Sequence, residues 1–151
     1  MSRRDQIRMT DDEVRAFLEE STTMTLATIG ADGRPHLTAM WYGIADGHVV
    51  FWSYRSAQKI VNLRRDPRLS ILVEAGDTYG ELRGVSITGT GTMLDDPDDV
   101  LAVGQILLER QAPGFTATAS AAAATAPKRV AVRIDPERVT SWDHRKLGGG
   151  Y

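Results

Sequence analysis

The chain has 151 residues, with 18 lysine and arginine against 20 aspartate and glutamate side chains and a formal net charge of −2. This length suits one domain over residues 1–151, and the charge balance lacks the basic excess of a dedicated nucleic-acid-binding protein. The absence of cysteine excludes disulfides and thiolate chemistry. No apolar run approaches the roughly 20 residues of a membrane span. We therefore expect a soluble, cytoplasmic protein that binds neither nucleic acid nor membranes.

The N-terminal half predicts one helix followed by strands. Thr10 and Glu13 form a capping-box pattern that opens a helix over residues 11–20. The pattern then changes to that of strands, which we expect over three segments, 23–29, 36–42 and 48–53. An Asp-Gly turn signal separates each of these segments from the next. The three strands are therefore predicted to form an antiparallel meander.

The middle of the chain predicts a short helix and two further strands. Ser56 stands where an N-cap belongs, and the helix should end at Asp66-Pro67 because proline cannot continue a helix interior. Alternating apolar and polar residues predict strands over 69–73 and 82–94. Gly89 and Gly91 inside the second strand indicate a bend or bulge of the kind found at barrel corners.

The last third predicts a helix, a connector and the final strands. Pro97 near the first turn opens a helix that runs to about Gln111. Residues 112–127 are rich in alanine and uncharged, so we expect a flexible or weakly helical connector. Two further strands are expected over 129–134 and 139–142, followed by a Gly-rich tail at 148–150. Six or seven mostly antiparallel strands with three short helices favour a small closed barrel.

Motifs for phosphate-binding loops, nucleophile elbows and metal sites are missing from the sequence. The three histidines, His36, His48 and His144, lack metal-ligand spacing. We therefore expect no metal site and leave the catalytic residues unassigned.

Residues 52–59 carry the most informative pattern, which is a strand end, a tight connection and a helix start. A helix N-terminus presents free N–H groups, and a lysine there opposes the helix dipole unless an anion lies between them. The polar donors of this segment are Ser53, Arg55, Ser56, Gln58 and Lys59. They suit a phosphate group, although a solvated surface helix start is the alternative.

The strand at 36–42 has two different faces. One face carries His36, Thr38 and Met40, and the other carries Leu37, Ala39 and Trp41. The following strand adds Phe51 and Trp52. An aromatic wall beside a phosphate site fits a flat cofactor ring, although filling of a barrel core explains the same residues more simply.

Several motifs resemble the flavin/deazaflavin oxidoreductases, the split-barrel proteins related to pyridoxamine 5'-phosphate oxidase. The likeness rests on LATIGADGRPHLTAMWYG, FWSYRSAQKIVNLRRDPRLSILVE and GVSITGTGTML, and it resumes over residues 129–147. The A-D-G-R-P turn and the segment K-x-x-N-L-R-R-D-P-R look most like the branch that uses the deazaflavin coenzyme F420. The resemblance implies a mainly β fold with short helices, a six-stranded antiparallel split β-barrel that forms a homodimer with cofactor grooves at the dimer interface.

The resemblance also implies a cofactor site. Lys59 matches the family's phosphate-binding lysine, and Ser53 lies on the preceding strand end. Gln58 stands where the FMN-binding oxidases carry arginine, which favours F420 over the alternative cofactor, FMN. The predicted cofactor-binding residues are His36, Thr38, Met40, Trp41, Tyr42, Trp52, Ser53, Gln58, Lys59 and Arg83.

The activity that the resemblance implies is reductase activity, in which a hydride passes from the reduced deazaflavin to a small unsaturated organic acceptor. The alternatives are an FMN-binding oxidoreductase of the same fold and a non-catalytic F420-binding protein. The pyridoxal-phosphate contacts of true pyridoxamine phosphate oxidases are not recognisable, so that specific activity is not expected.

Overall fold

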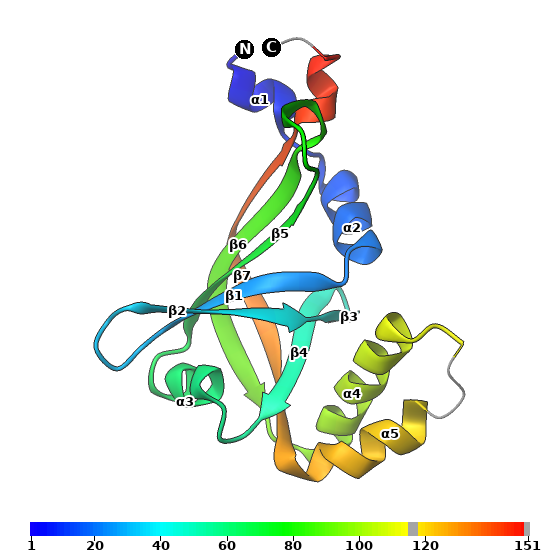
Figure 1. Ribbon diagram of the computed structural model, residues 1–151. Coiled ribbons are helices and arrows are strands. Elements are labelled where there is room, and N and C mark those ends of the chain that lie inside the picture. The colour runs from blue at the N-terminus through cyan, green and yellow to red at the C-terminus, as the bar shows by residue number, and fades with distance from the viewer. Residues whose placement is uncertain (115–117, 150–151) are drawn as a thin grey trace.

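The structure is a computed structural model that describes residues 1–114 and 118–149 (Figure 1). Seven strands form one curled antiparallel sheet in the order β2-β1-β5-β6-β7-β4-β3. The strands are β1 (Thr23–Ile29), β2 (Pro35–Trp41), β3 (Gly43–Ala45), β4 (His48–Tyr54), β5 (Arg68–Ala75), β6 (Arg83–Leu94) and β7 (Arg129–Asp143). The predicted mainly β class is confirmed, with seven strands in place of six.

Short helices lie around this sheet. The α-helices are α1 (Arg3–Ile7), α2 (Asp11–Glu20), α3 (Gln58–Arg65), α4 (Pro97–Gln111) and α5 (Thr118–Thr125), and the 3-10 helices are η1 (Tyr79–Glu81), η2 (Ala126–Lys128) and η3 (His144–Leu147). The capping box of Thr10 and Glu13 is present at α2 as predicted. The predicted N-cap of α3 is wrong, because Ala57 occupies that position without a side-chain cap and Ser56 lies in the preceding turn. No described helix is long and apolar enough to cross a membrane.

The predicted meander of the first three strands is wrong. β1 and β2 form a hairpin, but β4 pairs with β3 and β7. Tyr42 alone separates β2, at one end of the sheet order, from β3, at the other end. The chain therefore passes from one sheet edge to the opposite edge within one residue, which requires the sheet to curl until its two edges are close.

The two predicted C-terminal strands are one long strand, β7. Pro136, which has no N–H to donate to a neighbouring strand, lies between the two predicted segments. It lies opposite Gly89, where the register between β6 and β7 shifts in a bulge. A Cβ at Gly89 would come within 2.1 Å of the Asp135 carbonyl oxygen. The missing side chain therefore allows the backbones to approach at the irregularity, and this confirms the predicted bulge.

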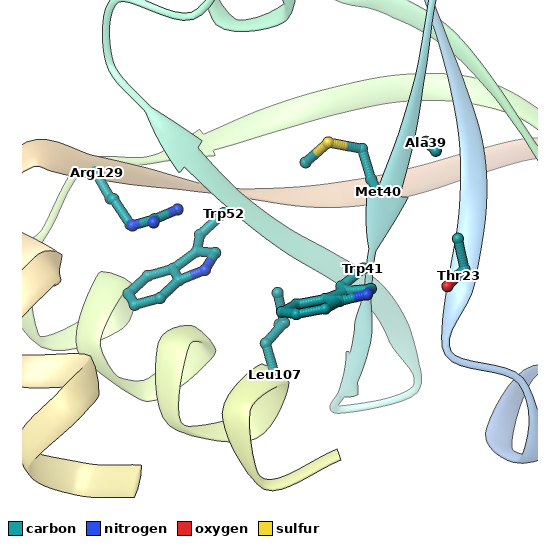
Figure 2. Close-up of a pocket in the computed structure, with 7 residues that line it drawn as sticks. All are labelled: Thr23, Ala39, Met40, Trp41, Trp52, Leu107 and Arg129. Carbon is teal, nitrogen blue, oxygen red and sulfur yellow. The ribbon is translucent and has the colours of Figure 1, made fainter. Parts of the chain in front are cut away.

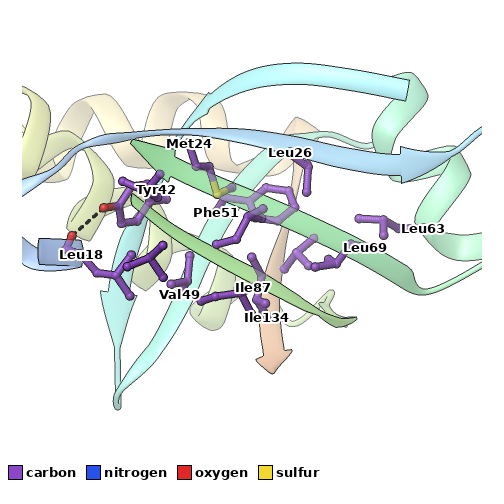
Figure 3. Close-up of a cluster of buried hydrophobic side chains, with 14 of the residues drawn as sticks. Leu18, Met24, Leu26, Tyr42, Val49, Phe51, Leu63, Leu69, Ile87 and Ile134 are labelled. Carbon is purple, nitrogen blue, oxygen red and sulfur yellow. Dashed lines mark hydrogen bonds between the residues drawn. The ribbon is translucent and has the colours of Figure 1, made fainter. Parts of the chain in front are cut away.

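The buried side chains form two clusters, one on each face of β4. Figure 3 shows the inner cluster, in which Phe51 of β4 packs with residues from the other strands of the curled sheet. Val50 and Trp52 belong instead to the second cluster, together with residues of α4 and α5 such as Leu107. Because both faces of β4 are covered, its sequence reads as a continuous apolar run rather than an alternating one.

The Ala-rich connector is helical over most of the length that the structure describes. α5 and η2 occupy residues 118–128, and α5 packs against α4. Residues 115–117 of the connector lie outside the described residues, as does residue 150 of the Gly-rich tail. At the opposite end of the long strands, α1 lies beside η3, so a helix near the start of the chain neighbours one near residue 147 (Figure 1).

Candidate functional site

Strand pairing in the curled sheet is interrupted along the free edge of β2, and we call this break the opening. β2 pairs with β1 on one side only and is an end strand of the sheet. On the opposite sheet edge, β3 covers β4 only over His48–Val50, and residues 51–54 of β4 pair with β7 alone. Two unpaired strand edges therefore border the same part of the fold. The residues predicted to bind a cofactor come from these two strands and from α3.

Lys59 and Ser53 meet at this opening, and we call this pair the phosphate corner. Lys59 Nζ lies 3.4 Å from Ser53 Oγ, and Ser53 is only 6% exposed. Burial lowers the pKa of Lys59 below its ordinary value. Among the described residues no carboxylate pairs with this ammonium group, so the corner holds a partly desolvated cation without a counter-ion. An anion bound there would restore the balance of charge.

The inward face of β2 adds two further polar groups. His36 lies opposite Thr28 and Thr38 lies opposite Leu26 in the pairing with β1. The His36 Nδ1 and Thr38 Oγ1 atoms are buried and have no hydrogen-bond partner within residues 1–114 and 118–149. Unpaired buried polar atoms are rare in folded proteins. Both atoms therefore lack the partner that a buried polar group usually has.

A buried hydrogen bond fixes α3 against β1. Asn62 is fully buried and donates from Nδ2 to Thr28 Oγ1 at 3.1 Å. The amide of Gln58 donates to Asn62 Oδ1 at 2.7 Å, so the Gln58 side chain supports this contact. This hydrogen bond therefore fixes the position of α3, the helix that carries Lys59, relative to β1. Arg55 and Ser56, the other predicted donors, are exposed in the turn before α3.

A concavity, which we call the outer pocket, lies beyond the free edge of β2. Figure 2 shows Trp41 of β2 on one side, Trp52 of β4 on the other and Leu107 of α4 between them. Thr23, Ala39, Met40 and Arg129 complete the lining. Trp52 and Ser53 are neighbours in β4 and therefore point to opposite faces. The outer pocket and the phosphate corner thus lie on the two sides of the same strand.

Two of the predicted residues lie away from the opening. The Tyr42 side chain is fully buried and its hydroxyl donates to the Leu18 carbonyl at 2.6 Å (Figure 3). Burial raises the pKa of Tyr42 to about 12. Arg83 forms an ion pair of 2.5 Å with Glu20 and is the first residue of β6. The residues of β6 that pair near Arg129 are the last ones of the strand, so Arg83 lies at its far end. The structure does not bring Tyr42 and Arg83 to the phosphate corner.

Arg129 and Leu107 line the outer pocket and were missed by the sequence analysis. Arg129 was read only as the first residue of a strand, and Leu107 only as an apolar residue of a helix. Their position depends on the long-range pairing of β4 with β7 and on the packing of α4 over that pair. Local sequence patterns carry no signal for either contact. The described residues contain no group of three or more metal-binding side chains.

Comparison with known proteins identifies the family. Residues 10–143 match the family model described as pyridoxamine 5'-phosphate oxidase, so the chain belongs to that family. A pyridoxine/pyridoxamine 5'-phosphate oxidase of Cupriavidus metallidurans is 42% identical over 64 residues, which are 41% of this chain and 30% of that protein. The chain spans about a third of the length of the curated relatives it matches.

Solved structures extend the likeness over the whole chain. A conserved hypothetical protein of Mycobacterium tuberculosis is 45% identical, with a TM-score of 0.92 and coverage of 100% of this chain and 95% of that one. An F420 reductase is 23% identical, with a TM-score of 0.65 and coverage of 83% and 94%. The second likeness concerns the fold alone. The matched family is described as an oxidase, and which residues bind a cofactor stays a prediction.

Proposed function

We propose that this protein is a reductase that uses the deazaflavin coenzyme F420 and acts on a small unsaturated organic acceptor. When bound, the reduced coenzyme would supply the hydride, which is why the chain needs no nucleophile or metal of its own. The protein's part is to bind and orient the coenzyme. The F420 reductase among the structural neighbours has the same fold and supports this choice.

The observation that carries the proposal is the phosphate corner. Lys59 offers an ammonium group without a carboxylate partner among the described residues, and Ser53 offers a hydroxyl 3.4 Å away. Both lie beside the turn that precedes α3, whose first N–H groups are free to bind an anion. This donor set fits the phosphate of a flavin-type cofactor. The buried, unpaired atoms of His36 and Thr38 offer further contacts for the polar edge of a ring system.

FMN is the second candidate cofactor, because the chain belongs to the pyridoxamine 5'-phosphate oxidase family. The sequence resemblance places Gln58 where FMN-binding oxidases carry arginine, and the Gln58 amide is committed to Asn62. One guanidinium contact to the FMN phosphate is therefore missing. This difference favours the deazaflavin over FMN.

A titration of the cofactor-free protein with F420 and, separately, with FMN tests the proposal. Binding is followed by quenching of tryptophan fluorescence, and we expect F420 to bind more tightly than FMN. Lys59→Ala should weaken F420 binding by about tenfold or more, since it removes a charged hydrogen bond. Lys128→Ala, at an exposed lysine of η2, is the matched control and should leave the affinity unchanged. An unchanged affinity in Lys59→Ala would overturn the phosphate assignment.

Turnover separates a reductase from a protein that only binds the coenzyme. Reduced F420 is mixed with a panel of enones, quinones and tetrapyrroles, and its reoxidation is followed by absorbance. Oxidation that depends on both the protein and one acceptor supports the reductase. Tight binding without turnover of any acceptor class supports the non-catalytic alternative.

We also propose that two copies of the chain pair through the outer face of β1 and β2. This face carries threonines and apolar side chains, and Leu37 on the end strand β2 is 64% exposed. An apolar side chain this exposed on a strand with a free edge favours association with a second copy. Leu37→Glu should convert a dimer to a monomer in sedimentation equilibrium, with Val61→Glu on the exposed side of α3 as the control. A native chain that sediments as a monomer would contradict this pairing.

A further inference from the structure

The outer pocket has a lining suited to a small flat molecule. Its volume is about 250 Å³, just below the roughly 300–1,000 Å³ of most small-molecule sites. It therefore suits a small ligand or one end of a longer one. Two indoles, Trp41 and Trp52, face it together with the side chains of Met40 and Leu107 (Figure 2). Such a lining favours a planar, conjugated molecule.

Arg129 gives this apolar pocket a cation. Its guanidinium carbon lies 4.4 Å from the ring centre of Trp52 and 4.2 Å from that of Tyr54. The guanidinium group thus lies over two neighbouring aromatic rings, and these contacts restrict its orientation. Its Nε atom is buried and has no hydrogen-bond partner within the part of the chain that the structure describes.

Several other arginines of the fold have a carboxylate partner, which Arg129 lacks. Arg133, four residues further along the same face of β7, lies 2.8 Å from Asp135. Arg64 of α3 lies 2.7 Å from Asp95. No described carboxylate pairs with Arg129, although its fork of N–H donors matches the geometry of a carboxylate. The pocket therefore combines a fixed, unpaired cation with aromatic walls.

We propose that the outer pocket binds a small planar carboxylate. Arg129 donates hydrogen bonds to the carboxylate oxygens, and Trp52 and Trp41 contact the planar part of the molecule. That this ligand serves as the second substrate rests on the proposed reductase function. That it binds in the outer pocket is independent of that function. The site also differs from the phosphate corner, because the two lie on opposite faces of β4.

Direct binding to the cofactor-free protein tests this assignment. The two probes are coumarin-3-carboxylate and coumarin-3-carboxamide, which share a flat conjugated ring and differ in charge. In isothermal titration calorimetry the carboxylate should bind at least about tenfold more tightly, as expected for a charge-assisted hydrogen bond. Arg129→Met keeps an apolar contact on Trp52 but removes the charge, so it should abolish this preference. Arg129→Lys keeps the charge without the fork and should preserve part of the preference.

Arg133→Met is the matched control, because it removes an arginine from the same face of the same strand outside the pocket lining. It should leave the preference for the carboxylate unchanged. Equal affinity of the native protein for both probes, or binding of neither, would overturn the proposal. So would a preference that persists in both Arg129 variants.

Two cross-checks separate this proposal from the proposed function. Lys59→Ala should leave the affinity for coumarin-3-carboxylate unchanged, and Arg129→Met should leave the affinity for F420 unchanged. If F420 fails to bind while the carboxylate preference depends on Arg129, the reductase function fails and the anion site stands. If Arg129→Met also loses F420, the outer pocket belongs to the coenzyme and this proposal is wrong.

Discussion

The indole of Trp52 lies directly on Gly104 of α4. A Cβ atom added at Gly104 would come within 2.2 Å of the six-membered ring of Trp52. Glycine costs about 1 kcal/mol relative to alanine in a helix interior, so its presence in the middle of α4 needs a reason. The close approach provides one, because it lets α4 cover Trp52 and form a wall of the outer pocket.

Gly104→Ala should therefore destabilise the protein although it improves helix propensity. The added methyl group must displace a side chain that is only 8% exposed, and overpacking of this kind costs about 1–3 kcal/mol. We expect a net loss of about 1–2 kcal/mol in the free energy of unfolding, measured by urea denaturation, with a shift in tryptophan emission. Gly80→Ala, where a Cβ would meet nothing within 4 Å, should change stability by less than about 0.5 kcal/mol. Unchanged stability and emission in Gly104→Ala would contradict the packing.

The hydrogen bond between Asn62 and Thr28 should account for much of the attachment of α3. Both side chains are almost fully buried, so removal of one partner leaves the other unpaired at a cost of about 1–3 kcal/mol. Thr28→Val and Asn62→Ala should each destabilise by that amount. In the double variant the losses should fall short of their sum by about 1 kcal/mol. Strict additivity in urea denaturation would show that the two groups do not interact.

Asp143 should make stability dependent on pH in the acid range. The Arg145 guanidinium, 2.7 Å away, lowers the pKa of this nearly buried carboxyl in the folded protein. The unfolded state therefore takes up the proton first as the pH falls. The stabilisation is complete above the unfolded pKa of about 4 and is lost as the pH falls through the lower folded pKa. In Asp143→Asn the free energy of unfolding should fall less steeply with pH below about pH 4 than in the native protein. Asp77→Asn, in an exposed loop, should leave this pH dependence of the free energy of unfolding unchanged.

The sequence predicted local elements well and their partners poorly. The capping box of Thr10, the end of α3 at Asp66 and the bulge at Gly89 depend on neighbouring residues or on backbone chemistry, and each was found. The meander failed because Tyr42 carries the chain from one sheet edge to the other. That passage depends on the closure of the whole sheet, which turn signals do not encode. The gap predicted between strands 129–134 and 139–142 is absent because Gly89, on another strand, accommodates Pro136.

For the candidate site, too, local features could be predicted from the sequence and long-range contacts could not. Ser53 and Lys59 are six positions apart across one turn, so their proximity could be expected from the strand end and the helix start. The alternation of β2 correctly grouped His36 with Thr38 on its inner face. Arg129 could not be expected, because it reaches Trp52 only through the pairing of β7 with β4.

A substitution at Tyr42 tests whether this side chain binds the cofactor, as the sequence predicts, or only packs in the buried cluster. Tyr42→Phe removes a hydroxyl that donates to the Leu18 carbonyl, and Arg110 still donates to the same oxygen. The cost should therefore lie near about 1 kcal/mol, at the low end for a buried hydrogen bond. Because the Tyr42 side chain lies in the inner cluster, the Tyr42→Phe variant should bind F420 in the fluorescence titration as tightly as the native protein does. A weaker F420 affinity without any loss of stability would instead indicate that Tyr42 belongs to the cofactor site.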